Sequence, residues 1–484
     1  MKTSRLDPPQ VLSSREPDSA LSEAVQHTPF FRWKTDVPMA IAVLLLAVWR
    51  IGTPSMWRDE AVTAADAQSG WREILQTSHD IDMVHTPFYL LEWLWTSIFG
   101  LSDMALRMPS ALAITASAIC LTAIARQYTV ELNAVLCTVI FVLMPAATRY
   151  AQEAREGALL IMLGVISTLL LHIAVRRGSD KVWVAYAVVL ALIPPFNVIA
   201  AYILIPHFLY ALYWKRLKPW CIAAVPALLT AGAMAVLAAP QRATMLDVYV
   251  APPTLRGFVG YADSLFESRA IAVLFVVTAA IFVVMAFRQG RIEEYSWLLA
   301  LAILPLPLWI VSHVQNVFLF RYGLYALPFF ALIAVLVLRF WYVIAVYVVV
   351  LATLSLPLDV HYRAADGHGE DFRSLFADIE RSAKPGDAIV TDNWMVRAAK
   401  DYYLHSALAD PLDPHGVTSE AIRSAGGIPC TATELASYHR VWFVWFVRPS
   451  TKVAENPPDR CDPSLGLKSV VRRGVLTAEL YTRD

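Results

Sequence analysis

Residues 157–175 read GALLIMLGVISTLLLHIAV, a run of 19 residues without an Asp, Glu, Lys or Arg. A helix that crosses the hydrocarbon core of a bilayer needs about 20 mainly apolar residues, so this stretch predicts a membrane-spanning helix. Similar runs recur along the chain, in which 57% of the 484 residues are hydrophobic and 17% are charged. Soluble domains carry about 25% charged residues. The composition therefore excludes a soluble globular enzyme and a disordered chain.

The length of the apolar runs favours helices over the strands of a membrane barrel, which alternate in polarity over about ten residues. The predicted fold class is an α-helical polytopic membrane protein with about 11 transmembrane helices. The predicted spans are about 38–53, 108–125, 132–147, 157–175, 182–194, 196–213, 220–239, 270–287, 295–312, 322–338 and 340–357.

Positive charge decides how these spans are oriented, because cytoplasmic loops collect Lys and Arg. If the N-terminal segment with Arg32 and Lys34 is cytoplasmic, eleven spans place every positive cluster on that side. The stretch 182–213, interrupted by Pro194 and Pro195, must then form a hairpin; one long kinked helix would invert everything after it. We expect an integral plasma-membrane protein with a cytoplasmic N-terminus. The clusters are Arg126, Arg176–Arg177–Lys181, Lys215–Arg216–Lys218, Arg288–Arg291 and Arg339.

The apolar stretch 87–101 is interpreted as a helix that lies on the outer membrane surface. It has 15 residues, includes Glu92, and carries Tyr89, Trp93 and Trp95. Tryptophan and tyrosine prefer the membrane interface. A twelfth span is the alternative, and it would break the charge pattern.

The topology divides the chain into three parts. Residues 1–35 are polar and are expected to form a disordered cytoplasmic tail. Residues 36–357 form the transmembrane domain, with a long outer loop over 54–107, and residues 358–484 form a small extracytoplasmic α/β domain. In that domain, helical patterns occupy 371–380 and 394–405, and strand patterns occupy 387–392, 440–447 and 473–482.

Cysteine usage and net charge restrict the possible chemistry. Cys430 and Cys461 lie in the outer domain, where a disulfide between them is compatible with an oxidising compartment. No CxxC pair or histidine-rich metal spacing is present in the sequence. The 40 Lys and Arg balance the 40 Asp and Glu, which excludes a nucleic-acid-binding protein.

An acidic pair follows the first predicted span, in WRDEAVTAAD at residues 57–66. Ionisable residues at membrane depth are expensive and indicate a functional site, so Asp59 and Glu60 are candidate catalytic residues. The alternative interpretation is that two acids at the start of a helix complement its dipole.

Further polar residues are predicted on the same outer face, and the alternative interpretation for them is a set of weak interfacial ion pairs. Two acidic pairs and several arginines on one face favour a site for an anionic, hydroxyl-rich substrate. These candidates are Arg149, Tyr150, Gln152, Glu153 and Arg155 in RYAQEARE at 149–156, together with His85, Asn197, Arg321 and Tyr322.

With these residues, the chain resembles the C-type (GT-C) superfamily of integral-membrane glycosyltransferases. The resemblance is to the branch of protein O-mannosyltransferases and lipid A aminoarabinose transferases, and it spans residues 38 to about 392. One departure is Thr86-Pro87 in place of Pro-Pro; another is His85, where relatives often have Lys and where a neutral imidazole would be a weaker phosphate anchor. The matching pieces are WRDEAVTAAD, HTPFYLLEWLWTSIFGLSDMALRMPSAL, MPAATRYAQEAREGAL, FRYGLYALP, EDFR and KPGDAIVTD.

The resemblance implies an inverting enzyme that moves a sugar from a polyprenyl-phosphate donor on the outer face of the membrane. The acceptor would be a cell-envelope glycan, lipid or protein. The Ala-, Val- and Arg-rich composition is compatible with a high-GC organism, in which mannose and arabinofuranose donors serve the envelope. A divalent cation is left open, since some members of the superfamily use one and others do not. Gln152 and Glu153 are expected to hydrogen-bond sugar hydroxyls.

The resemblance also implies roles for the charged residues. Asp59 is expected to take the proton of the acceptor hydroxyl, and Glu60 to support it or to bind a metal ion. Arginine suits the departing phosphate because its planar fork bonds two oxygens. Arg321, with Tyr322, is the first candidate for this role and Arg155 is the second.

Two functions from other classes compete with this hypothesis. One is a lipid or solute transporter, but transporters tend to show inverted repeats, and no repeat is visible in this sequence. The other is a non-catalytic scaffold with the same fold. The presence of both Asp59 and Glu60 argues against the scaffold.

Overall fold

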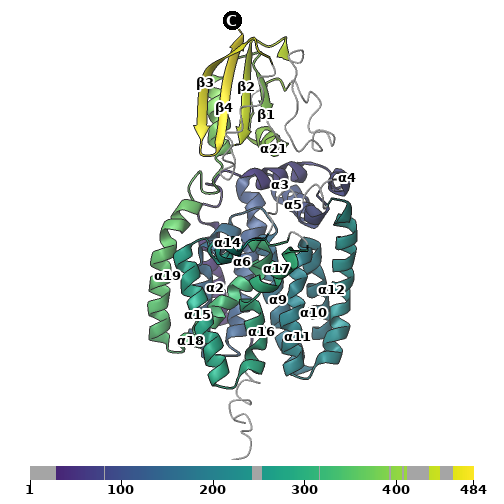
Figure 1. The fold of residues 1–484 in the computed structure, drawn as a ribbon, viewed down its shortest axis with the longest axis vertical. Coiled ribbons are helices and arrows are strands. Elements are labelled where there is room, and N and C mark those ends of the chain that lie inside the picture. Colours follow the sequence, from purple (N-terminus) through teal and green to yellow (C-terminus); the bar gives the residue numbers. More distant parts are fainter. Residues whose placement is uncertain are drawn as a thin grey trace, which may run out of the picture.

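The computed structural model describes residues 29–80, 82–241, 253–314, 317–391, 394–405, 408–410, 435–446 and 462–483. A bundle of helices carries a smaller helix-and-sheet domain at one end (Figure 1). Most of the predicted N-terminal tail, up to residue 28, lies outside the described residues, as do Cys430 and Cys461. The tail and the disulfide therefore stay predictions.

The described bundle contains six helices that are long and apolar enough to cross a membrane, or up to eight if two bent pairs are single spans. The bent pairs are α7 (Glu131–Val142) with α8 (Pro145–Ala151), at 67°, and α16 (Ile292–Ala302) with α17 (Pro305–Ser312), at 51°. Each second helix begins at a proline, which cannot continue the preceding hydrogen-bond ladder. The six helices are α6 (Asp103–Ala125), α9 (Gly157–Arg177), α12 (Leu217–Ala238, extended by η3, Ala239–Gln241), α15 (Arg269–Arg288), α18 (Leu327–Leu338, preceded by η4, Phe320–Ala326) and α19 (Trp341–Tyr362).

The other three predicted spans are also helical, but they are shorter. They are α2 (Trp33–Val48), α10 (Asp180–Phe196) and the run formed by η2 (Val198–Ile203) and α11 (Leu204–Tyr213). The predicted hairpin is present, because Tyr186 on α10 hydrogen-bonds His207 on α11 at 3.0 Å and accepts from Trp220 on α12 at 3.0 Å. The three helices therefore pack side by side (Figure 1).

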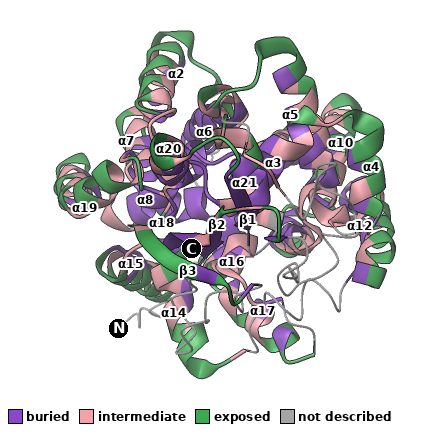
Figure 2. Cartoon of the chain, turned by 90° about the horizontal axis from the view of Figure 1, so that it is seen from above, coloured by how far each residue is buried: buried purple, intermediate pink, exposed green. Residues whose placement is uncertain are grey.

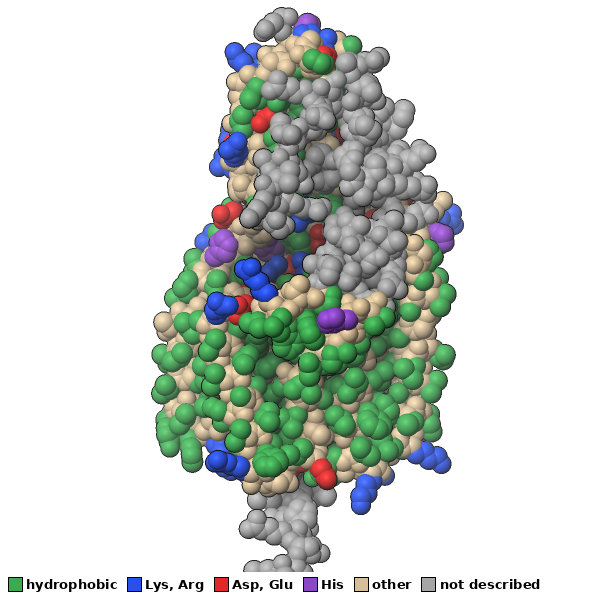
Figure 3. Space-filling view, in the orientation of Figure 1, with side chains coloured by type: hydrophobic (Ala, Val, Ile, Leu, Met, Phe, Trp, Pro, Cys, Tyr) green, Lys and Arg blue, Asp and Glu red, His purple; other side chains and the backbone are tan. Residues whose placement is uncertain are grey.

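Positive residues gather at the end of the bundle opposite the sheet domain. Arg126 donates to the carbonyl of Phe30 at 3.0 Å and to Asp36 at 2.9 Å, and the Arg177 guanidinium lies 5.2 Å from the Phe30 ring. These contacts bring the start of α2 beside the α6–α7 turn and the end of α9. Figure 3 shows Lys and Arg side chains at this end. The arrangement agrees with the predicted topology, and the cytoplasmic location of this end stays a prediction.

Four short segments lie across the other end of the bundle, below the sheet domain (Figure 1). They are α3 (Arg58–Gln68), α4 (Trp71–Asp80), η1 (Met83–His85) and α5 (Thr86–Phe99); a further helix, α14, covers Leu255–Leu265. In α5, Phe88 and Tyr89 are buried, whereas Leu94 and Ile98 are exposed. One apolar face thus packs on the protein and another is free to contact lipid. This arrangement agrees with the surface helix expected at 87–101.

The C-terminal domain, called the outer domain after its predicted location, contains a four-stranded sheet with the strand order β1-β2-β4-β3. β1 (Ala388–Thr391) runs parallel to β2 (Arg440–Phe446), and β4 (Leu476–Arg483) is antiparallel to both β2 and β3 (Leu465–Arg473). Helices α20 (Phe372–Ser382) and α21 (Trp394–Tyr403) bury apolar residues against the sheet. The predicted helices and strands are present. β3 was not predicted, because its residues are mostly exposed and its apolar residues do not alternate regularly with polar ones.

The outer domain is joined tightly to the bundle. α19 continues to Tyr362, past the boundary expected at 358. Seen from above, α3 and α21 lie side by side near the middle of the molecule and are largely buried (Figure 2). Arg373 donates to the carbonyls of Thr53 at 2.8 Å and Gly52 at 3.0 Å. The loop that leads into the acidic pair is therefore held by the outer domain.

Candidate active site

Helix α3 follows the first bundle helix after a loop over residues 49–57 and carries the acidic pair in its first turn. Trp57 precedes the helix, and its backbone N–H donates to the Glu60 carboxylate at 3.4 Å. Carboxylates are favourable at this position because the first turn exposes unpaired N–H groups. Asp59 and Glu60 point in different directions, as adjacent residues on a helix must. They therefore have different partners.

Glu60 is fully buried and bonded on both oxygens. Arg107 donates from Nε to Oε1 at 2.8 Å and from Nη2 to Oε2 at 2.7 Å, and the Ala154 N–H donates to Oε1 at 2.7 Å. Burial by itself raises the pKa of Glu60, but the charges and hydrogen bonds of Arg107 and His368 hold it well below its usual range. Glu60 thus joins α3 to α6 and to the loop before α9. This supporting role is one of the two expected for it.

The other expected role of Glu60, metal binding, does not fit these contacts. Its two oxygens are already bonded to Arg107, which would compete with a cation for the same carboxylate. Across the described ranges, no group of three or more His, Cys, Asp or Glu side chains is placed to hold a metal ion. The roles assigned to Asp59 and Glu60 therefore involve no metal ion.

Asp59 lies on the more open side of α3. Its Oδ2 accepts a hydrogen bond from Nη1 of Arg321 at 3.4 Å, and the two side chains are 26% and 29% exposed. The Arg321 guanidinium also lies 4.9 Å from the centre of the Trp57 ring. The structure therefore brings the predicted base and the first predicted phosphate ligand together. Tyr322, beside Arg321, packs against the apolar core of the bundle.

The segment 149–156 contributes Arg149 and Glu153 to the charged site. Arg149 donates to Glu267 at 2.7 Å, and its Nε lies 3.8 Å from the Glu153 carboxylate. Burial raises the pKa of Glu153, and the charges of Arg149, Arg321 and His368 oppose this shift. Glu153 is thus near Arg321, the residue that bonds Asp59. Its carboxylate belongs to the same site.

Two predicted substrate contacts have structural partners instead. The Gln152 side chain donates to the carbonyls of Ala47 at 2.9 Å and Trp49 at 2.8 Å, which fastens the end of α2. Asn197 accepts from the N–H groups of Ile199 and Ala200 and caps η2. Within the described part of the chain, no contact joins either residue to Asp59 or Arg321. We therefore leave both out of the proposed site.

A second charged group surrounds His85. Its Nδ1 lies 2.6 Å from Asp82 and its Nε2 lies 3.5 Å from Glu156, while Tyr89 donates to Asp82 at 2.7 Å. Burial and Arg155 favour the neutral ring, but the charges of Asp82 and Glu156 outweigh them and raise the pKa of His85 to about 9. The ring is therefore positively charged at neutral pH. The neutral imidazole expected from the sequence is wrong, because Asp82 was not recognised as its partner.

Arg155 connects the two charged groups. It donates to Tyr89 at 3.2 Å, and it interacts electrostatically with Glu156, Asp59 and Asp82. Figure 3 shows charged side chains gathered in a recess where the outer domain meets the bundle. The site therefore has one part around Asp59 and Arg321, and a second part in which His85 and Arg155 are paired with Asp82 and Glu156.

Several site residues were missed by the sequence analysis. Arg107 and Glu370 both lie in the family-like pieces MALRMPSAL and EDFR, which gave a signal without a role. Glu370 accepts from the Arg58 N–H at 2.9 Å and lies 2.9 Å from the Arg58 Nε. His368, two residues earlier, lies 3.4 Å from Glu60. These residues come from distant segments, so only the fold shows that they meet.

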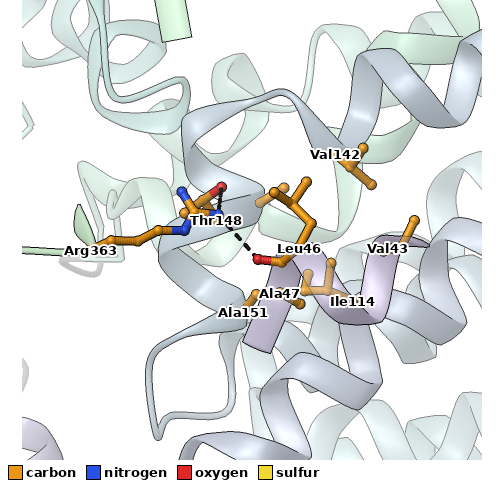
Figure 4. Close-up of a pocket in the computed structure, with 9 residues that line it drawn as sticks. Val43, Leu46, Ala47, Ile114, Val142, Thr148, Ala151 and Arg363 are labelled. Atoms are coloured by element: carbon orange, nitrogen blue, oxygen red, sulfur yellow. Dashed lines mark hydrogen bonds between the residues drawn. The ribbon is translucent and has the colours of Figure 1, made fainter. Parts of the chain in front are cut away.

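A separate apolar groove lies between α2, α6, α7 and α8 (Figure 4). It encloses about 230 Å³, including space open to solvent. Arg363 closes one end and donates to the Leu46 carbonyl at 3.3 Å and to the Thr148 hydroxyl at 3.4 Å. The groove shares no lining residue with the charged cluster. Its other lining residues are Val43, Ala47, Ile114, Val142, Ala147 and Ala151.

The chain is similar to one protein family in part of its sequence and to solved membrane-protein structures over most of its length. Residues 84–242 match a family model described as dolichyl-phosphate-mannose-protein mannosyltransferase. Comparison with curated proteins gives no match. Among solved structures, the chain is similar to ArnT from Cupriavidus metallidurans bound to undecaprenyl phosphate, with 11% identity and a TM-score of 0.56, over 93% of this chain and 98% of that one. The apo state of ArnT gives 12% identity and a TM-score of 0.54, over 96% and 98%.

These similarities agree with the apolar helices and the small terminal sheet. At this level of identity, the solved structures establish the fold and nothing finer. The chain is an integral multi-pass membrane protein. It has an ArnT-like fold, and the match of residues 84–242 to the mannosyltransferase family model agrees with the resemblance seen in its sequence.

Proposed function

We propose that this protein is a glycosyltransferase that uses a polyprenyl-phosphate sugar as donor and acts on the outer face of the membrane. The sugar would be mannose or arabinofuranose, and the acceptor a glycan, lipid or protein of the cell envelope. The observation that carries the proposal is the partly exposed carboxylate of Asp59, 3.4 Å from Arg321, beside the cationic pair His85 and Arg155.

Asp59 acts as the general base. Its carboxylate takes the proton of the acceptor hydroxyl as that oxygen attacks the anomeric carbon from the face opposite the phosphate. The bond between the anomeric carbon and the phosphate oxygen breaks, and polyprenyl phosphate leaves with the electron pair. The configuration inverts because no covalent sugar–enzyme intermediate forms. One carboxylate is enough, which leaves Glu60 to hold α3 in place.

The cationic residues bind and stabilise the leaving phosphate. Arg155 is buried and His85 is partly buried, and each carries positive charge that can form strong charge-assisted hydrogen bonds to an anion. Arg321 already bonds Asp59, and its remaining N–H groups can donate to the phosphate. In this arrangement Arg321 orients the base and binds the donor at once.

Two further observations support a lipid-phosphate donor on the outer face. The charged cluster lies at the end of the bundle away from the positive residues near Arg126 and Arg177. ArnT, which shares the fold, was crystallised bound to undecaprenyl phosphate. A donor whose lipid stays in the membrane and whose phosphate reaches the interface suits this position.

The experiment is a transfer assay with purified protein and radiolabelled polyprenyl-phosphate mannose or polyprenyl-phosphate arabinofuranose. The wild type is expected to release labelled sugar from one of the two, and Asp59→Asn is expected not to. Glu73→Gln, the same change on an exposed residue of α4, is the matched control. Failure of the wild type to use either donor would refute the proposed function.

A further inference from the structure

His368 lies in a tight turn between the last bundle helix and the outer domain. The Gly367 N–H donates to the Ala364 carbonyl at 3.0 Å, and the Gly369 N–H donates to the Asp366 carbonyl at 2.7 Å. A Cβ at Gly367 would lie 2.4 Å from a backbone carbonyl, and Gly369 has a φ of +84°. Both positions therefore require glycine. The turn fixes the backbone of the histidine between them.

Glu60 orients the imidazole of His368. The Nδ1 atom lies 3.4 Å from Glu60 Oε2, and the His368 side chain is 4% exposed. A nitrogen that faces an ionised carboxylate carries a hydrogen, so Nε2 is the ring nitrogen left to bond another group. Nε2 is buried and has no hydrogen-bond partner among the residues that the structure describes. Such atoms are uncommon in proteins.

Three more buried polar atoms near His368 also lack a hydrogen-bond partner within the described ranges. They are the indole Nε1 of Trp57, the hydroxyl of Tyr150 and Oε2 of Glu153. Trp57 stacks on Arg321, and the charges of Arg321 and His368 both act on Glu153. Tyr150 interacts electrostatically with Glu153 and Arg321. Trp57, Tyr150 and Glu153 therefore lie around Arg321, and His368 is linked to them through Glu153.

The chemistry of these four atoms fits a sugar better than a phosphate. The indole N–H donates, the carboxylate accepts, and the tyrosine hydroxyl and the imidazole Nε2 can each pair with a hydroxyl group. Sugar hydroxyls are both donors and acceptors, so each atom could be paired. A phosphate would be repelled by the Glu153 carboxylate next to these atoms.

We propose that His368, held by Glu60, binds a hydroxyl of the donor sugar through Nε2 in a subsite completed by Trp57, Tyr150 and Glu153. This inference rests on the proposed function and adds the place of the sugar to it. His368 contacts the sugar and takes no proton from the acceptor. The polyprenyl phosphate lies against His85 and Arg155, within reach of the N–H groups of Arg321 that do not bond Asp59.

The test compares binding of two lipids to the full chain in detergent: undecaprenyl phosphate, which has no sugar, and the sugar-bearing donor that the wild type accepts. His368→Asn keeps a group near Nδ1 and loses Nε2, whereas His368→Gln places an amide near Nε2. His361→Asn, on the exposed end of α19, is the matched control. Dissociation constants come from ligand-dependent shifts in thermal unfolding.

His368→Asn is expected to bind the sugar-bearing donor roughly 3- to 10-fold more weakly, the effect of one hydrogen bond to an uncharged group. Binding of undecaprenyl phosphate should stay unchanged, and His368→Gln should recover part of the loss. Equal weakening for both lipids, or none for either, would overturn the subsite. If His368→Asn does not fold, Trp57→Phe, which removes the indole N–H together with the five-membered ring, must give the same selective loss. A wild type that binds neither lipid would instead refute the proposed function itself.

Discussion

The buried pair formed by Glu60 and Arg107 should be the strongest single link between the acidic helix and the bundle. Arg107→Met keeps the length of the side chain and leaves the Glu60 carboxylate buried without its partner. Removing one member of a buried ion pair costs about 3–5 kcal/mol. Glu60→Gln should cost a similar amount, since it leaves the Arg107 charge uncompensated. Both variants should unfold at a lower temperature in detergent.

The double variant gives the sharper result. With both charges gone, no buried charge is left unpaired, and such replacements are often close to neutral. Arg107 also donates to the carbonyls of Ile51 and Pro54, at 2.9 and 2.8 Å, and these would lose a partner. We therefore expect the double variant to lie about 1–3 kcal/mol below wild type, since each neutral hydrogen bond contributes about 1 kcal/mol. Single effects that simply add in the double variant would refute this account.

Three further predictions follow from the charges of the site and the topology. Because the pKa of His85 is raised to about 9, its positive charge is present at neutral pH and is lost as the pH rises through that value. Binding of undecaprenyl phosphate, measured by thermal shift, should therefore weaken above pH 9 in the wild type. His85→Asn should bind undecaprenyl phosphate weakly at every pH. Arg321→Ala should weaken donor binding about 10- to 100-fold, the value of a hydrogen bond to a charged group, and unchanged binding would contradict its assignment to the phosphate. A cysteine placed at Gly70 should react with an impermeant thiol reagent from outside the cell, and one at Leu217 only after permeabilisation; equal labelling would exclude the predicted orientation.

Much of the fold was predictable because a membrane-spanning helix needs a long apolar run, and such runs are visible in the sequence. Apolar runs such as 157–175 can only be spans or buried helices, and loop charges order them. Periodicity could not show where the proline-broken pairs bend, since the bend at Pro145 or Pro305 depends on packing against neighbouring helices. The exposed edge strand β3 was missed because its side chains carry no alternating pattern.

The candidate site was predictable in its acids and less so in their partners. Asp59 and Arg321 were both named, and their contact is a result of the fold alone, since 262 residues separate them. Arg107 lies at the start of an apolar helix, and no sequence pattern assigned it a role in the site. His85 was expected to be neutral because the carboxylate that charges it, Asp82, belongs to no recognised motif. Gln152 was taken for a substrate contact, although a buried amide can equally fasten a helix end.

The central claim is that Asp59 is the general base, and Asp59→Asn tests it most directly. The change keeps the size and hydrogen-bonding shape of the side chain and removes the proton acceptor. We expect turnover at saturating donor to fall about 10²- to 10⁴-fold, the usual contribution of general base catalysis, while the dissociation constant for undecaprenyl phosphate stays near that of the wild type. A variant that keeps its turnover at saturating donor but no longer binds undecaprenyl phosphate would contradict the assignment.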